Sequence, residues 1–237
     1  MKITFTCMSP LGILTCSLFF LGSAGAQDTN TYLYVAQAAS GRNISPTANP
    51  AYPIDVSANG VCIVKGEAFG QIVGPFTGPA TSYTFNVSVA NTQTPCSNPP
   101  IFTASDISLA PGSTYFGVVT LDAGNNVTGQ IYAADFSSIP AGQSRFVIAN
   151  ATGQNLTATL KQQEDLSVDI GAYSLQEAEV PSGHYSGSIF LQGTDTLEAG
   201  PQSVNAMSRD LYFYVLGGSA SNNSVQIIGP KVIKDVF

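Results

Sequence analysis

Short runs of alternating apolar and polar residues recur along the chain, and each run ends in a turn rich in glycine, asparagine or proline. The clearest run is residues 82–90, where Tyr83, Phe85, Val87 and Val89 alternate with polar residues. Alternation with a period of two is typical of a strand that buries one face. No run has the apolar spacing of an amphipathic helix. We therefore predict an all-β protein of short strands.

Turn residues show how neighbouring runs are connected. Asn59-Gly60 separates two apolar runs, and this pair favours the type I′ turn of a β-hairpin because both residues accept positive φ. Residues 69–76 are interrupted by glycines and predict an irregular edge strand. Further strands are predicted at residues 31–38, 54–58, 61–65, 104–109, 115–121, 127–133, 144–151, 156–160, 166–170, 184–191, 210–216 and 225–228.

The second half of the chain repeats the order of the first. Residues 144–155 have the same pattern as residues 31–43, an apolar strand followed by a small polar corner. Agreement in order, spacing and turn chemistry indicates an internal repeat. We predict two tandem immunoglobulin-like or transthyretin-like antiparallel β-sandwich modules of six or seven strands each. Further matches are residues 82–90 with 184–191, 115–121 with 210–216, and the turn 124–126 with 221–223, and the predicted modules are residues 27–136 and 144–237, joined by a linker at 137–143.

The first 26 residues have the features of a secretory signal peptide. Lys2 supplies a positive start, residues 11–21 are apolar, and residues 23–26 are small, as a cleavage site requires. The alternative is a membrane anchor, but the apolar run is shorter than the roughly 20 residues that span a bilayer. No later segment is apolar enough to span. The sequence therefore predicts a protein that is secreted, periplasmic or on the cell surface, with no transmembrane segment after removal of the signal.

Composition and charge narrow the possible partners. The chain is 44% apolar and 10% charged, which is unlike a disordered protein. It has 8 Lys and Arg against 15 Asp and Glu, so that loss of Lys2 with the signal changes the net charge from −7 to −8. An acidic surface does not favour the phosphate backbone of nucleic acid. We predict no nucleic-acid partner.

Two of the four cysteines, Cys62 and Cys96, remain after signal removal. A pair of cysteines in an exported chain predicts a disulfide. The alternative, a metal or redox pair, lacks the close spacing and the accompanying histidine of such sites.

Few residues are candidates for catalysis or metal binding. His184 is the single histidine, and no nucleophile-elbow motif accompanies it. The acids cluster closely at Glu164-Asp165 and at Glu177 and Glu179, in segments predicted to be loops. A turn with Asp122, Asn125 and Asn126 offers oxygen ligands for calcium but not the EF-hand spacing. We predict no catalytic, cofactor-binding or metal-binding residues, although a hydrolase cleft around His184 or two acids stays open as an alternative. Acceptors for N-glycosylation lie at Asn43, Asn86, Asn126, Asn150, Asn155 and Asn222.

Several of these motifs, in this order, resemble the secreted domain-of-unknown-function family 4397. The resemblance covers most of residues 31–136 and, more weakly, residues 142–230. The chain departs from the family at its first corner, where Gln37-Ala38-Ala39-Ser40 stands in place of His-Ala-Ser-Pro. The family implies a bacterial exported or cell-surface β-sandwich without an established activity. The matching motifs are Ile54-Asp55-Val56, Asn59-Gly60, Phe69-Gly70, Ser82-Tyr83-Thr84 and Ala110-Pro111-Gly112-Ser113.

The second half is also similar to the periplasmic accessory protein of alginate O-acetylation, around Leu160, Gly183 and residues 211–217. We predict an exported, non-enzymatic binding or structural module of the cell envelope or extracellular space. Exposed tyrosines, of ten in the chain, and Asn and Thr residues in loops suit contact with a polysaccharide or with a protein partner. Another envelope protein is the other candidate partner, and the alternative function is an accessory factor in exopolysaccharide modification.

Overall fold

A computed structural model of the chain describes residues 29–162, 165–218 and 225–236. The predicted signal peptide, residues 1–26, lies outside these ranges, as do Glu164 and the turn 221–223. The described residues form strands almost throughout, and the one helix among them, α1 (Gly41–Ile44), is a single turn in the corner after the first strand. No helix in the described ranges is long and apolar enough to cross a membrane.

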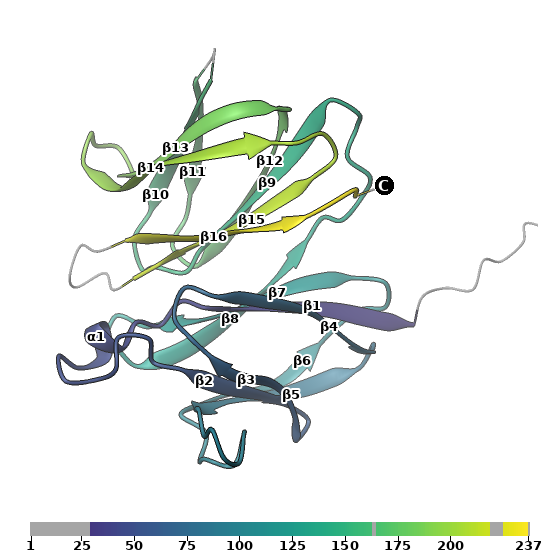
Figure 1. Ribbon diagram of the computed structural model, residues 1–237, viewed down its shortest axis with the longest axis vertical. Helices are drawn as coiled ribbons and strands as arrows, with labels where there is room; N and C mark the ends of the chain where they lie inside the picture. Colours follow the sequence, from purple (N-terminus) through teal and green to yellow (C-terminus); the bar gives the residue numbers. More distant parts are fainter. Residues whose placement is uncertain (1–28, 163–164, 219–224, 237) are drawn as a thin grey trace, which may run out of the picture.

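Eight described strands form each module (Figure 1). Those of the first module are β1 (Asn30–Gln37), β2 (Ile54–Ala58), β3 (Val61–Glu67), β4 (Ile72–Pro79), β5 (Ser82–Val89), β6 (Phe102–Ser108), β7 (Thr114–Leu121) and β8 (Val127–Ala134). Those of the second are β9 (Gln143–Asn150), β10 (Leu156–Lys161), β11 (Asp165–Ile170), β12 (Ser174–Pro181), β13 (Gly183–Leu191), β14 (Leu197–Ala206), β15 (Leu211–Gly217) and β16 (Gln226–Ile233).

The two modules have the same topology. In the first, sheet A has the order β4-β1-β7-β8 and sheet B the order β3-β2-β5-β6. In the second, sheet C has the order β12-β9-β15-β16 and sheet D the order β11-β10-β13-β14. Adding eight to each strand number of the first module reproduces the second. The tandem β-sandwich prediction is confirmed.

Two details differ from the sequence prediction. In each module the first strand pairs in parallel with the seventh, β1 with β7 and β9 with β15, while the other pairs are antiparallel. The second module also contains two strands, β12 and β14, that alternation alone did not reveal. Both are edge strands with polar residues or a Gly-Pro pair in their sequence, so that their apolar face is incomplete.

The four sheets stack in the order B, A, C, D, with sheets A and C facing each other in the middle (Figure 1). Three apolar cores result, one inside each module and one between the modules. We call the last the middle core. It holds buried residues of β1, β7, β9, β15 and β16, together with Ile139 from the segment predicted to be a linker. The modules are therefore joined face to face by packed side chains as well as by the connecting chain.

Equivalent residues of the two modules meet in the middle core. In the parallel strand pairs, Gln37 lies opposite Val119 in the first module and Asn150 lies opposite Leu216 in the second. Val119 and Leu216 are therefore equivalent, and so are Phe116 and Phe213, which lie three residues before them. These two rings stack with their centroids 3.5 Å apart and their planes 14° apart. A hydrogen bond also crosses the interface between the modules. The hydroxyl of Thr120 donates to the carbonyl of Ala151 at 2.8 Å.

A buried arginine fixes the connecting segment to the second module. The side chain of Arg145, on β9, is 4% exposed. Its guanidinium donates to the carbonyls of Asp135 and Ser137 at 2.7 and 3.2 Å, and it forms ion pairs with the carboxylates of Asp135 and Glu179. Glu179 lies on β12, so one guanidinium ties the end of the first module to two strands of the second.

Candidate functional site

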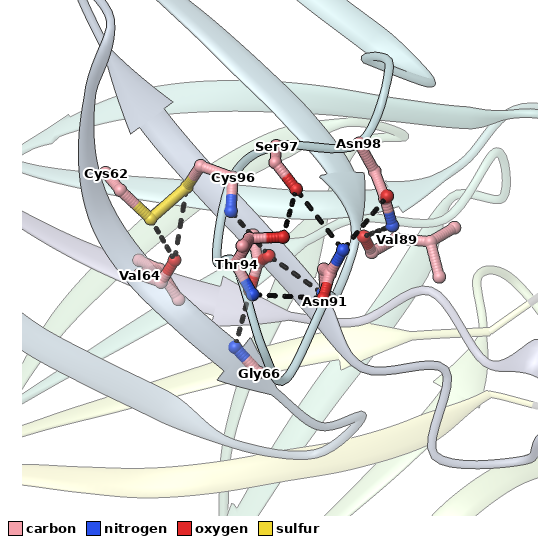
Figure 2. The surroundings of a disulfide bond; sticks show 10 residues. Cys62, Val64, Gly66, Val89, Asn91, Thr94, Cys96, Ser97 and Asn98 are labelled. Atoms are coloured by element: carbon pink, nitrogen blue, oxygen red, sulfur yellow. Dashed lines mark hydrogen bonds between the residues drawn. A yellow bond between two sulfur atoms is a disulfide. The ribbon is translucent and has the colours of Figure 1, made fainter.

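A disulfide anchors the longest described loop of the first module. Cys62 on β3 and Cys96 in the loop between β5 and β6 are bonded, with their Cα atoms 5.7 Å apart. Both sulfur atoms lie close to the carbonyl of Val64, as Figure 2 shows. The predicted disulfide is thus present, and it ties a loop to the edge strand of sheet B.

Asp55 holds the same loop from the other side. It lies on β2 and is 1% exposed. One carboxylate oxygen accepts from the backbone N–H of Gly66 at 2.8 Å, and the other accepts from Asn91 and Cys96 at 3.1 and 2.8 Å. A buried carboxylate is stable here because three backbone donors surround it. The Ile54-Asp55-Val56 motif therefore has a structural role.

The loop also carries its own hydrogen bonds (Figure 2). The Asn91 side-chain oxygen accepts from the backbone of Gln93 and Thr94, both at 3.1 Å. The Asn98 amide donates to the carbonyl of Val89 at 2.9 Å. These contacts, with the disulfide and Asp55, give the loop a defined shape on the outside of the molecule.

Buried amides occupy the two equivalent corners after the opening strands. Gln37, where the family often has histidine, is fully buried; its side chain accepts from the N–H of Ala39 and donates to the carbonyl of Tyr52. Asn150 is also fully buried and accepts from the N–H of Thr152 at 3.0 Å. Both side chains satisfy backbone groups of the corner that has no sheet partner. The burial of Asn150 removes it from the candidate glycan acceptors in the folded chain.

Two equivalent tyrosines donate hydrogen bonds to the backbone at corners of the fold. The hydroxyl of Tyr83 donates to the carbonyl of Pro79 at 2.7 Å, and that of its counterpart Tyr185 donates to Pro181 at 2.6 Å. This bond, from a tyrosine back to the chain a few residues earlier, resembles the tyrosine corner of immunoglobulin-like sandwiches. Tyr34, Tyr185, Tyr212 and Tyr214 are buried, and the other six tyrosines are partly buried. None of the ten tyrosines is fully exposed, and the six that are partly buried are those that still offer part of a ring to a partner.

Of the residues considered for catalysis, His184 lies on β13, while Glu177 and Glu179 make contacts within the fold. His184 is exposed on β13 opposite Asn205 of β14. Glu177 and Glu179 lie on β12 and not in a loop, because their strand pairs with β9 and presents them to the connecting segment. Glu179 binds Arg145, and Glu177 accepts from the backbone N–H of Asp135 at 3.0 Å. Asp165 forms an exposed ion pair with Lys161.

The turn considered for calcium is held together by its own side chains. One oxygen of Asp122 accepts from the backbone N–H of Gly124 and of Asn126, at 2.8 and 2.9 Å. The bonds from Asn126 and Gly124 lower the pKa of the Asp122 carboxyl. Because these donors already occupy the carboxylate, the turn needs no metal ion. No group of three His, Cys, Asp or Glu side chains suited to a metal occurs in the part of the chain that the structure describes.

The sheet order and the anchored loop define the class as a tandem β-sandwich protein with a disulfide between Cys62 and Cys96. The model of the family Domain of unknown function (DUF4397) matches residues 42–158, and this segment of the chain belongs to the family. The match runs from α1 to β10, so that it extends across the middle of the chain into the second module. No curated protein matches the chain.

Three solved structures are similar in parts. The Bacillus anthracis TIE protein shares 11% identity with a TM-score of 0.26; the match covers 80% of this chain but 34% of that chain, so this chain spans about a third of it. A protein named "putative cell adhesion protein" from Bacteroides ovatus ATCC 8483 shares 9% identity with a TM-score of 0.30, over 86% and 97% of the two chains. One of the same name from Bacteroides uniformis ATCC 8492 shares 10% with a TM-score of 0.28, over 88% and 100%. Similarities of this size support no inference about function.

Proposed function

We propose that this protein is an exported, non-enzymatic module of the cell envelope or extracellular space, which presents a rigid surface to a protein partner. The observation that carries the proposal is that charged side chains which a catalytic centre would need are bound to groups of the fold. Arg145, Asp55, Glu179 and Asp122 each bind groups of the fold itself. A catalytic centre needs such groups free to meet a substrate.

The disulfide supports an oxidising compartment, where such bonds persist. The hydroxyls of Tyr83 and Tyr185 donate to the backbone at corners, and four tyrosines are buried, which leaves fewer rings as platforms for sugars. A protein partner is favoured over a polysaccharide for this reason. The middle core makes the two modules one body, which suits a protein that must hold a surface in a fixed orientation.

The test uses residues 27–237, oxidised, and envelope preparations treated in parallel with protease or with periodate. We expect saturable binding that protease abolishes and periodate leaves intact. The opposite pattern would establish a carbohydrate ligand and refute the protein partner. An assay with ester and glycoside substrates, with His184→Ala as control, should show no turnover above buffer; turnover that falls in the variant would show that the protein is an enzyme.

A further inference from the structure

The edge strands of the four sheets differ in how regular they are. Register shifts interrupt the pairing of β3, β4 and β6 in the first module. In the second module, β14 and β16 have register shifts and contain Pro201 and Pro230. Bulges and prolines hinder the pairing of a further strand with a sheet edge. These edges are therefore poorly suited to binding an extended chain.

Three described edge strands, β8, β11 and β12, pair with their neighbours without a register shift. Two of them have further contacts across the fold. The ring of Phe102 lies over Gly129 of β8, where an added Cβ atom would come within 2.9 Å of the ring. Glu177 of β12 accepts from the backbone N–H of Asp135, at the start of the connection between the modules.

The outer edge of the third strand, β11, is open. This strand pairs residue by residue with β10, from Asp165 opposite Lys161 to Ile170 opposite Leu156. Alternate residues of such a strand direct their N–H and C=O groups away from the sheet. Within the described ranges, the backbone of residues 165–169 makes no hydrogen bond besides those of this ladder. The strand therefore offers unpaired donors and acceptors over a length typical of a strand.

The equivalent edge of the first module, β3, is different. It has two register shifts in its pairing with β2, and its backbone takes a positive φ at Gly66. The disulfide of Cys62 also ties it to the anchored loop. The open edge is therefore a feature of the second module and not of the topology that both modules share.

The side chains of β11 alternate between two surroundings. Leu166 and Val168 are half-buried on the face towards sheet C, and Val168 lines a narrow gap between sheets C and D. Asp165, Ser167 and Asp169 are exposed on the other face. A strand added at this edge would follow the same alternation. Its inner side chains would extend the apolar face, and its outer side chains would lie beside the acids.

The exposed acids favour a positively charged neighbour. The Thr157 hydroxyl donates to the Asp169 carboxylate at 2.6 Å, and this bond lowers the pKa of the Asp169 carboxyl. Asp169 is therefore charged at neutral pH. Asp165 has Lys161 3.6 Å away, but both side chains are 58% exposed, and an ion pair in water is weak. Both carboxylates thus stay accessible to a cation from another chain.

A second copy of this chain is a poorer occupant of the edge. The chain has a net charge of −7, so two copies repel each other. Two β11 strands paired antiparallel about Ser167 would also place Asp165 of each copy opposite Asp169 of the other. Like charges directly opposite each other destabilise strand pairing. The charges therefore favour a different chain that carries cations.

We propose that the outer edge of β11 binds an extended segment of a protein partner as a fifth strand of sheet D, and that this segment alternates Lys or Arg with apolar residues. Backbone hydrogen bonds to the open edge supply the affinity in this mode of binding. The alternation supplies the selectivity, since the cations meet Asp165 and Asp169 while the apolar side chains lie beside Leu166 and Val168. The inference rests on the proposed function, because it assigns the binding site and the chemistry of the protein partner.

The probe is a seven-residue peptide with blocked ends and the sequence Thr-Lys-Val-Thr-Val-Lys-Thr, which reads the same in both directions. A second peptide has Glu in place of both lysines. Each is titrated into residues 27–237 and followed through the backbone amide signals in NMR. We expect saturable shifts centred on residues 165–169 with the lysine peptide, and at least tenfold weaker binding of the glutamate peptide.

Methylation of backbone nitrogens separates strand pairing from simple charge attraction. Successive residues of a strand direct their N–H groups to opposite sides. One form of the lysine peptide carries N-methyl groups on both valines, and another form carries them on both lysines. One of these two forms should bind as the unmethylated peptide does, and the other should lose binding.

Two variants test the edge itself. Asp165→Lys combined with Asp169→Lys should reverse the preference, so that the glutamate peptide binds at least tenfold more tightly than the lysine peptide. Val168→Lys places a charge where the apolar side chains of the added strand would lie, and should weaken binding of the lysine peptide at least tenfold. The matched control, Glu198→Lys, changes an acid on β14 at the opposite edge of the same sheet and should bind as the original chain does.

The proposal is overturned if no saturable shifts occur at β11, if both peptides bind equally, or if both methylated forms behave alike. It is also overturned if the β11 amides become protected from hydrogen exchange as the concentration of the chain alone rises, since the edge would then join two copies. If Val168→Lys unfolds the chain, the paired aspartate variant at exposed positions carries the test. If that paired variant still binds the envelope preparations as the original chain does, this inference fails while the proposed function stands.

Discussion

Arg145 carries a charge at a place where its side chain is 4% exposed, and the fold surrounds it with acceptors. A guanidinium is suited to this position because its planar fork can satisfy several carbonyl and carboxylate oxygens together. Desolvation of the charge opposes these contacts, and the net value of such pairs is therefore modest. The residue matters most through the acceptors that it satisfies, since the carbonyls of Asp135 and Ser137 belong to the connection between the modules.

Replacing Arg145 with methionine should lower the free energy of unfolding by about 2–3 kcal/mol, because hydrogen bonds from a charged donor to partly buried acceptors are lost. Lysine at the same position keeps the charge but not the fork, and should recover less than half of the loss. Denaturant titration followed by circular dichroism measures both. As a control, Glu179→Gln removes the charge of a carboxylate that is 41% exposed and should cost below about 1 kcal/mol. A larger effect for Glu179 than for Arg145 would contradict this account.

Glu67 is a second buried titratable residue, 7% exposed at the end of β3. Its Oε1 atom has no hydrogen-bond partner. Burial raises the pKa of the Glu67 carboxyl, and the charge of Lys231 on β16 partly offsets the shift. The folded state therefore binds the proton more tightly than the unfolded state does. The stability that comes from this proton is full below the unfolded pKa and is lost as the pH rises through the folded pKa.

The variant Glu67→Gln should accordingly raise the melting temperature at pH 7, because an amide at this buried position carries no ionisation cost. The difference between variant and original chain should shrink as the pH falls towards the ordinary glutamate pKa of 4.5. Differential scanning calorimetry at pH 7 and pH 4 provides the comparison. Glu198→Gln, on β14, serves as a control and should show the same melting temperature as the original chain at pH 7. A difference that is equal at both pH values would show that the effect of Glu67 is not one of proton binding.

The strands differ in how well their sequences predict them. The strands β5, β7, β13 and β15 have clear apolar patterns, and the structure contains all four. The strands β12 and β14 lie at sheet edges, where one neighbour is missing and polar residues are tolerated, and their patterns are weak for that reason. Because the apolar pattern of β12 is weak, the sequence predicted a loop for Glu177 and Glu179, which lie on this strand. Edge strands depend on their partners more than on their own side chains.

The anchored loop between β5 and β6 depends on two elements that the sequence places far apart. Asp55→Asn should lower the free energy of unfolding by about 2 kcal/mol, because an amide cannot accept from all three backbone donors. Replacing both Cys62 and Cys96 with serine should cost about 4 kcal/mol on the chain-entropy model for a separation of 34 residues. Urea titrations of each variant give these values.

The combined variant tests whether the two anchors share one loop. Because Asp55 binds the backbone of Cys96, its effect should be smaller once the disulfide is absent, and the summed costs should exceed the measured one by at least about 0.5 kcal/mol. Thr157→Ala on β10, which is remote from the loop, should combine additively with the cysteine variant. Additivity for Asp55 as well would mean that the disulfide and the carboxylate act independently.

At the scale of the whole molecule, the middle core determines whether the two modules unfold together or separately. The segment 137–143, predicted as the linker between the modules, contains Ile139, which is 2% exposed and packs against residues of both. The two modules should unfold in one cooperative transition, because either module alone would expose the apolar face that it buries in the middle core.

Phe213→Ala is therefore expected to destabilise both modules by about 3–5 kcal/mol, the usual cost of removing a buried phenylalanine ring. Native-state hydrogen exchange should show equal losses of protection in β5 of sheet B and in β13 of sheet D, the outer sheets of the stack. Phe85→Ala, in the core of the first module, provides the matched comparison. Loss of protection confined to the second module would show that the modules unfold separately.

The sequence by itself determined the all-β class, the repeat, the cysteine pair and the positions of most strands. Each of these depends on local alternation, on turn residues or on counting. The parallel pairing of β1 with β7 and the packing of sheet A on sheet C were decided by the tertiary structure. A pattern of apolar residues shows which side chains avoid water. It does not show which surface covers them, because contact between distant strands depends on the shape and volume of both partners. For this reason the sequence pattern indicates two similar modules, while the stacking of Phe116 on Phe213 between them emerges only in the folded chain.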